Sequence, residues 1–413
     1  MNDHLHGLDT LLVADAFSQH VVARLLDFFA DTSPWPRRLW EVGSVLALRE
    51  GAEAGTWLQS RVLSQSAVSW YLRALERQLG PDKGLGDSRL RKLLTELLRS
   101  GLAPDSRERR QLIQLIPAIT DGYLDRWAAA ADSAARPSPE RLACAIAAHL
   151  LDLGHSSGQL HRWARAVNAE PDATLRDVFD GAVKLAARPD ADYEVVVPFL
   201  SVPDHQQLAS GLPEWRPPEA AATWFRENGV EAPPRHNGAF VYSLKAKDPV
   251  GAARAAGSRV QRLEARRSYA RGSKKSLVPV GHVWIRGEHE PLPLNPPERG
   301  AKVLSLESEK TMYAVVHGDQ LDEALELAAP LNGGPAASAV SGAWAAIESL
   351  LYHPGDEADK EQGRAVAADR LAAIVACSWP RAELTALSYR HSPTAPDELL
   401  RELGACESNR QRS

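Results

Sequence analysis

The spacing of hydrophobic residues changes twice along the chain, and this restricts the fold more than any other feature. In residues 1–185, Leu, Ala and Trp recur at every third or fourth position, which is the spacing of helices with one buried face. Two-residue alternation, typical of strands, is clear from about residue 239, and helical spacing returns after about residue 320. The sequence therefore predicts a mainly α protein with a small α+β module in the middle.

The chain is too long for a single ordinary hydrophobic core, since it has 413 residues. Paired prolines and a weakened hydrophobic pattern mark a junction before the alternating region. The predicted parts are an all-α helical domain at 1–185, a junction at 186–238, a small α+β module with a basic helix at 239–320, and a helical bundle at 321–413.

Local signals place several helix boundaries in the first region. One predicted helix carries its apolar residues on one face and ends at Gly80-Pro81, whereas Ser138 and Pro139 have the pattern of an N-cap and a first-turn proline. The apolar face of the first of these helices comprises Val62, Val68, Leu72, Leu75 and Leu79. Tryptophans are more often core anchors than binding residues, so we expect those of this region to be packed inside. They include Trp35, Trp40, Trp57, Trp70, Trp127 and Trp163.

The last region shows two apolar stripes at helical spacing. The first comprises Val340, Trp344, Ile347 and Leu351, and the second comprises Ala367, Leu371, Ile374 and Ser378. These stripes predict two helices that pair across the polar loop 353–363. A shorter helix over 381–391 and a final one over 395–405 would complete a bundle of about four helices.

Charge and cysteine content exclude several classes of protein. Lys and Arg total 48 against 53 Asp and Glu, so the chain is not basic overall and any contact with nucleic acid must be a local patch. Cys144, Cys377 and Cys406 are far apart, which argues against a disulfide framework and a thiolate metal site and favours the reducing cytoplasm. No apolar run is long enough to span a membrane, and the first residues do not resemble a signal peptide.

Sequence motifs for cofactors and metals are also missing. Neither glycine-rich phosphate loop occurs, and His282 and His289 lack the spacing of a zinc site. We therefore predict no cofactor and no metal ion.

A cationic segment at 250–275 is the strongest local charge feature, with eight basic residues and the single acid Glu264. On a helical wheel, Arg259, Arg262 and Arg266 lie within roughly 60° of one another, beside an apolar stripe. Guanidinium groups bind phosphate through two parallel hydrogen bonds, and Tyr269 adds a stacking surface. The predicted nucleic-acid-binding residues are Arg259, Arg262, Arg266, Arg267, Arg271, Lys274 and Lys275. A solvated helix face, or pairing with the acidic C-terminal region, would give the same pattern.

A pattern near the C-terminus resembles a known family. The segment A-W-x-A-I-E-S-L-L at 343–351, a polar loop, and A-x-D-R-L-A-x-I-V at 367–375 are similar to HEPN-type helical domains related to abortive-infection ribonucleases. The similarity covers about 70 residues. It implies a dimer in which Arg and His cleave RNA without metal, and it assigns these roles to Arg390, His391 and Arg381, with Glu348 to orient an arginine.

In outline this chemistry needs a base for the 2′-hydroxyl and a cation for the phosphorane. Each assigned residue also has a structural alternative. Arg390 and His391, followed by Pro393, match a helix C-terminus, where cations complement the helix dipole. Glu348 also fits an ordinary surface acid on the flank of a core helix.

Two functional hypotheses follow. The first is a cytoplasmic, toxin-like or antiviral defence protein of bacterial type, which binds RNA in preference to DNA, acts as a homodimer or in a protein complex, and cleaves RNA. The alternative is a non-catalytic helical scaffold or adaptor subunit of a defence or nucleic-acid complex.

Overall fold

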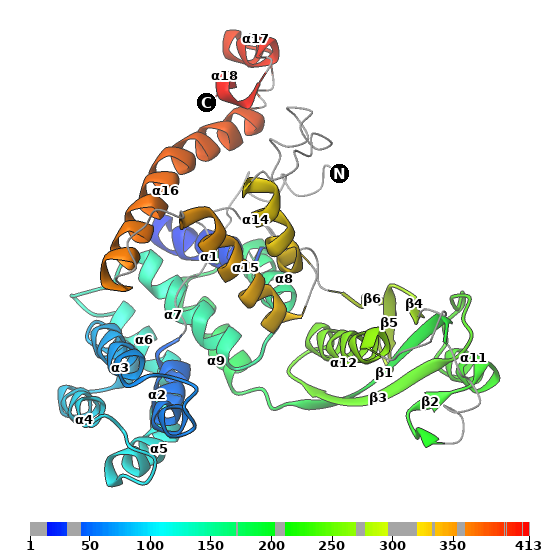
Figure 1. Cartoon of the computed structure of the whole chain (residues 1–413), viewed down its shortest axis with the longest axis horizontal. Helices are drawn as coiled ribbons and strands as arrows, with labels where there is room; N and C mark the ends of the chain where they lie inside the picture. Colours follow the sequence, from blue (N-terminus) through cyan, green and yellow to red (C-terminus); the bar gives the residue numbers. More distant parts are fainter. Residues whose placement is uncertain are drawn as a thin grey trace. The chain divides into compact units, whose positions relative to one another are not determined.

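The computed structural model describes residues 15–30, 43–170, 172–202, 211–269, 277–295, 320–332, 335–352, 360–391, 393, 395–406 and 408–412. The chain forms two compact units, Met1–Asn295 and Pro296–Ser413. Helices predominate in both, and the only sheet among the described residues lies in the first unit (Figure 1). The prediction of a mainly α protein with a small α+β module is confirmed. Within the described ranges, no helix combines the length and apolarity that a membrane span requires.

The first unit begins with a helical domain. Its helices are α1 (Ala16–Phe29), α2 (Ser44–Gln59), α3 (Gln65–Leu79), α4 (Ser88–Arg99), α5 (Arg107–Thr120), α6 (Tyr123–Ala131), α7 (Pro139–Asp152), α8 (Ser157–Ala169) and α9 (Leu175–Ala186), with a 3-10 turn η1 (Lys83–Leu85). Side-chain N-caps begin most of them, because a Ser, Thr or Asp oxygen accepts one of the unpaired backbone N–H groups. The Ser138 cap and the helix end before Gly80 both agree with the sequence prediction.

One hydrophobic core joins the helices of this domain. The α3 face is largely as predicted, since Val68, Leu72, Leu75 and Leu79 are buried, but Val62 lies outside the helix and is exposed. Trp127 is fully buried and Trp163 is half-buried, whereas Trp70 is 63% exposed, so the expectation of a packed Trp70 was wrong. Trp35 and Trp40 lie outside the described residues.

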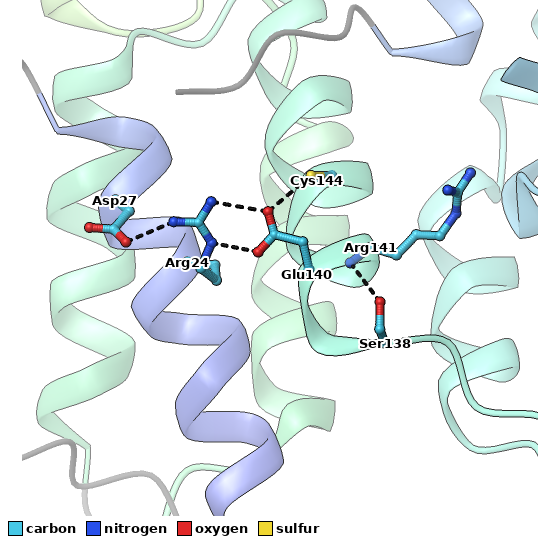
Figure 2. A network of polar contacts seen from close by, with 6 residues as sticks. All are labelled: Arg24, Asp27, Ser138, Glu140, Arg141 and Cys144. Carbon is cyan, nitrogen blue, oxygen red and sulfur yellow. Dashed lines mark hydrogen bonds and ion pairs between the residues drawn. The ribbon is translucent and has the colours of Figure 1, made fainter. Parts of the chain in front are cut away.

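A polar network on the domain surface joins α1 to α7 (Figure 2). Arg24 donates two hydrogen bonds to Glu140, from Nε at 2.5 Å and from Nη2 at 3.0 Å, and its Nη1 pairs with Asp27 at 2.8 Å. The bidentate geometry fixes one helix against the other, because both oxygens of one carboxylate are engaged by a planar guanidinium.

The module that follows is a six-stranded antiparallel sheet with a helix on each face. Its strands are β1 (Ala191–Ser201), β2 (Trp215–Arg216), β3 (Ala239–Ala246), β4 (Val278–Pro279), β5 (His282–Ile285) and β6 (Leu292–Pro293), in the order β2-β3-β1-β5-β6 with β4 also paired to β1. The central strand β1 and the helix α11 (Pro218–Glu227) both come from the segment 186–238 that the sequence suggested as a junction. Residues 296–319 of the predicted α+β module lie outside the described residues.

Alternation along β1 assigns its side chains to two separate cores, because successive residues point to opposite faces. Val195, Val197 and Phe199 pack with α12 (Pro249–Tyr269), whereas Val196 packs with Trp224 and Phe225 of α11. The sheet is thereby covered on both faces, and α12 lies along it (Figure 1).

The second unit consists of helices only, as far as it is described. These are α14 (Gln320–Ala328), a 3-10 turn η2 (Ala329–Asn332), α15 (Ala336–Leu351), α16 (Lys360–Arg390), α17 (Glu398–Ala405) and α18 (Asn409–Arg412). A close contact joins α14 and α15, since a Cβ placed on Gly342 would lie 2.3 Å from the carbonyl oxygen of Leu327. Residue 342 therefore has to be glycine or the helices must separate.

Two expectations for this unit differ from the structure. Segments predicted as two helices form the single helix α16, which continues through Pro380. The predicted stripes are mostly exposed. Val340 and Trp344 on α15 and Leu371 and Ile374 on α16 are all exposed, and of the stripe residues only Leu351 is buried. Spacing indicates which side chains share a helix face, but the buried face depends on where the partner helix lies.

A buried histidine makes the helical domain sensitive to acid. His149 is 3% exposed and stacks on Tyr123 with ring centroids 4.5 Å apart, and Tyr123 donates a hydrogen bond to Asp82 at 2.8 Å. Burial, with the charges of Arg49 and Arg126, lowers the pKa of His149 to about 4. In the unfolded chain His149 takes up a proton near pH 6.5, whereas in the folded protein it stays neutral until about pH 4. The free energy of unfolding therefore decreases as the pH falls from about 6.5 toward 4.

Replacing His149 with Phe should remove this loss, because the ring can still stack on Tyr123 but no longer titrates. Between pH 7 and pH 5 the wild type should lose about 2 kcal/mol more free energy of unfolding than the variant. Urea titrations at the two pH values measure this difference. His20→Gln, on the exposed surface, is the control for removal of an imidazole. An equal loss in wild type and His149→Phe would show that His149 is not the sensitive group.

Candidate nucleic-acid interface

Helix α12 is held to the sheet by small side chains. Ala252, Ala253, Ala256 and Val260 are buried in the core that it shares with β1 and β3. Gly257 lies against the backbone, since a Cβ there would be 2.3 Å from the carbonyl oxygen of Leu294. The apolar stripe predicted for this helix is confirmed, and the close packing leaves the opposite side of α12 in solvent.

The exposed side of α12 carries three arginines and a tyrosine. Arg259, Arg262, Arg266 and Tyr269 are all exposed, and the ring of Tyr269 is 90% exposed. At about 100° per residue these four positions lie within roughly 80° on the helix. We call this set the α12 face.

In the part of the chain that the structure describes, no carboxylate neutralises the arginines of the α12 face. Among the described residues, Arg259, Arg262 and Arg266 form no ion pair with Asp or Glu, and the guanidinium of Arg259 lies over the ring of Tyr242, 4.9 Å from its centroid. Glu264 is about 200° around the helix from Arg262. Burial raises the pKa of Tyr242 to about 12, so this ring supports Arg259 as a neutral aromatic surface.

The other predicted basic residues are less informative. Arg267 is half-buried. Arg271, Lys274 and Lys275 lie outside the described residues.

A buried carboxylate fixes the beginning of α12. Asp248 has no exposed surface, and its Oδ1 accepts a hydrogen bond from the backbone N–H of Gly251 at 2.8 Å, as a helix cap. Its Oδ2 accepts another at 2.8 Å from the N–H of Ser156, the residue that caps α8. One side chain therefore joins the first turns of two helices, one from the helical domain and one from the module.

Further polar contacts surround this carboxylate. Lys247 donates to the carbonyl oxygen of Arg188 at 2.6 Å and pairs with Asp190 at 3.3 Å, and Arg254 donates to Ser157 at 2.9 Å. The bond between Asp248 and Ser156 joins residues 92 positions apart, so no local pattern in the sequence predicts it.

His155 completes the buried side of the junction. Its Nε2 is 2.9 Å from the carbonyl oxygen of Leu185, and its Nδ1 is 3.9 Å from Asp248. Burial lowers the pKa of His155 and outweighs the opposite effects of Leu185 and Asp248. A neutral imidazole with Nε2–H as donor fits this site.

A second polar site of the module was not singled out as functional by the sequence. Glu194 on β1 accepts hydrogen bonds from Trp224 Nε1 at 2.6 Å and from Arg286 Nε and Nη2 at 2.9 and 2.6 Å. Partial burial raises the pKa of Glu194, but the hydrogen bonds from Trp224 and Arg286 outweigh it and lower the pKa overall. These contacts join β1, α11 and the residue that follows β5, so we interpret the site as structural.

The residues assigned by the HEPN resemblance lie in the second unit. His391 follows the last residue of α16, and its backbone N–H donates to the carbonyl oxygen of Leu387. Its Nε2 is 2.8 Å from Asp397 Oδ2, and Asp397 also caps α17 by accepting from the N–H of Leu400 at 2.7 Å. Those two contacts lower the pKa of Asp397.

Two of the remaining candidates make no polar contact with this histidine among the described residues. Glu348 on α15 and Arg381 on α16 are exposed. In the described part of the chain, no hydrogen bond or ion pair joins the side chains of Glu348, Arg381 and His391 to one another. The side chain of Arg390 lies outside the described residues.

The structure gives no indication of where a metal ion would bind. Over the described ranges, no group of three or more His, Cys, Asp and Glu side chains is arranged to hold a metal ion.

Comparison with known proteins does not assign a family to this chain. The sequence matches no protein-family model, and neither the curated proteins nor the solved structures contain a match. The HEPN resemblance therefore stays a prediction.

Among the polar residues of the module, we expect substitution of Asp248 to lower the free energy of unfolding most. Asp248→Ala removes a helix cap and leaves the buried N–H of Ser156 without its carboxylate, which should lower the free energy of unfolding by about 2–4 kcal/mol. Asp190→Ala, which removes an exposed partner of Lys247, should cost no more than about 0.5 kcal/mol. Urea denaturation compares the two variants. A similar loss of unfolding free energy in both variants would mean that the two hydrogen bonds of Asp248 contribute little to stability.

Proposed function

We propose that this protein binds nucleic acid through the α12 face, with RNA as the preferred ligand. The observation that carries the proposal is the row of exposed arginines, without carboxylate partners among the described residues, on a helix whose other side is anchored in a core. No catalytic step is needed for this function, which agrees with the scaffold or adaptor alternative.

Arginine chemistry supports a phosphate ligand. Each guanidinium offers a planar pair of N–H donors that matches two phosphate oxygens, and release of counterions from the nucleic acid favours the complex. A chain with a net charge of −5 cannot attract nucleic acid over its whole surface, so a local patch is required. The α12 face is such a patch.

The exposed tyrosine favours unpaired bases over a duplex. Tyr269 lies on the same side of α12 as Arg262 and Arg266, so a base can stack on its ring while phosphates bind the arginines. Bases inside a duplex are already stacked and unavailable. A single-stranded nucleic acid therefore uses every exposed group of the α12 face, and the preference for RNA depends on the HEPN resemblance.

Charge reversal on the α12 face tests the proposal. Changing Arg259, Arg262 and Arg266 together to Glu should weaken binding of labelled oligouridine at least about tenfold and reduce the salt dependence of log K by about 2. Fluorescence anisotropy over a salt series measures both quantities.

The matched control reverses Arg107, Arg110 and Arg141, which are exposed on the helical domain and give the same change of net charge. An equal loss in both triple variants would indicate a general charge effect. Unchanged binding in the α12 variant would refute the proposal.

Cleavage of RNA at His391 is a second candidate. The observation in its favour is the contact between His391 and Asp397, because a carboxylate that orients an imidazole is a common arrangement in a general base. The same contact also stabilises the beginning of α17, which is the structural alternative. The predicted role in defence or as a toxin, and the predicted dimer, depend on the HEPN resemblance alone.

Labelled RNA incubated with the purified protein and a chelator tests this candidate. If His391 is the base, the wild type cleaves RNA and His391→Ala is slower by about 10²–10⁴-fold. His289→Ala, an exposed histidine of the first unit, should cleave like the wild type. No cleavage by the wild type, or equal cleavage by His391→Ala, would rule out this role.

A further inference from the structure

Trp70 is an exposed tryptophan on an otherwise well-packed helix. Its side chain is 63% exposed, whereas Val68, Leu72 and Leu75 of the same helix are buried. At about 100° per residue, Trp70 lies within roughly 60° of Arg73 and Arg77, and Ser66 is on the same side. We call Trp70, Arg73 and Arg77 the α3 face.

The two arginines of the α3 face can bind an anion, because the acid of this helix is paired elsewhere. The one acid of this helix, Glu76, is paired with Arg99 of α4 at 2.5 Å. Arg73 donates from Nε to the carbonyl oxygen of Ser69 at 3.2 Å, and no carboxylate among the described residues pairs with Arg73 or Arg77. An exposed indole is thus bordered by two guanidinium groups that have no carboxylate partner in the described ranges.

We propose that the α3 face is a second contact for single-stranded nucleic acid, in which a base stacks on Trp70 and the flanking phosphates bind Arg73 and Arg77. The inference rests on the proposed function and extends it to the helical domain. From residue 70 to residue 77 the helix rises about 10 Å, which is roughly three nucleotides at the 3.4 Å spacing of a stacked strand. Aromatic stacking next to arginines is the usual way to hold a strand without reading its sequence.

The α3 face repeats the composition of the α12 face. Each has one exposed aromatic ring and at least two exposed arginines on one side of a helix, and each helix buries its other side in a core. A protein partner would be expected to meet further apolar side chains beside Trp70, but its neighbours on this side are Arg73, Arg77 and Ser66. A polyanion with flat bases fits these groups better.

Trp70→Ala tests the stacking contact. Binding of labelled oligouridine should weaken between about 5-fold and 100-fold, whereas binding of a duplex of equal length should change little, because stacking needs an unpaired base. Trp344→Ala is the matched control, since Trp344 is also 63% exposed but its helix α15 has no arginine. Thermal melts of both variants verify folding. Arg73→Glu with Arg77→Glu should lower the salt dependence of log K by about 1.4.

The outcomes separate this inference from the proposed function. If the α12 triple variant loses binding but Trp70→Ala does not, the α3 contact is refuted and the α12 interface stands. If Trp70→Ala alone weakens binding, the α3 contact stands and the α12 interface is refuted. Equal weakening of single strand and duplex by Trp70→Ala, or equal weakening by Trp344→Ala, would also refute stacking on Trp70.

Discussion

The carboxylate of Asp248 is the interaction on which the first unit most depends. It is buried, and it accepts one backbone N–H at the beginning of α8 and one at the beginning of α12. A buried carboxylate costs free energy unless its oxygens are paired, and the positive ends of two helix dipoles are suitable partners. The direction of α12, and with it the α12 face, follows from this junction and from the close approach of Gly257 to Leu294.

The sequence predicts those features of the fold that depend on local spacing. Alternating and helical periods give the fold class, and the apolar stripe of α12 correctly separates its buried side from its arginines. The bond from Ser156 to Asp248 joins residues far apart in the chain, so no local pattern contains it. Trp70 was wrongly expected in the core because tryptophan alone does not indicate burial, although its spacing from Arg73 and Arg77 was a usable signal.

In the second unit, predictions from local spacing mostly fail. Spacing places Val340 and Trp344 on one helix side, but this side is exposed, and the predicted break before the helix at 381–391 is absent because α16 continues through Pro380. The contact between His391 and Asp397 joins the residue after α16 to the N-cap of α17, and it fits a helix boundary as well as a chemical role. The proposed binding of nucleic acid by the first unit therefore has a stronger physical basis than the candidate cleavage of RNA by the second unit.

The length of α12 has a mechanical consequence. Its 21 residues form a rod of about 30 Å, with Tyr269 at one end and the Asp248 junction at the other. A strand that pulls on the arginines acts on this rod, which is held along the sheet by its buried side and at its first turn by the bonds of Asp248. Because Asp248 also accepts from the N–H of Ser156, part of the tension in a bound polymer would pass to the start of α8 in the helical domain.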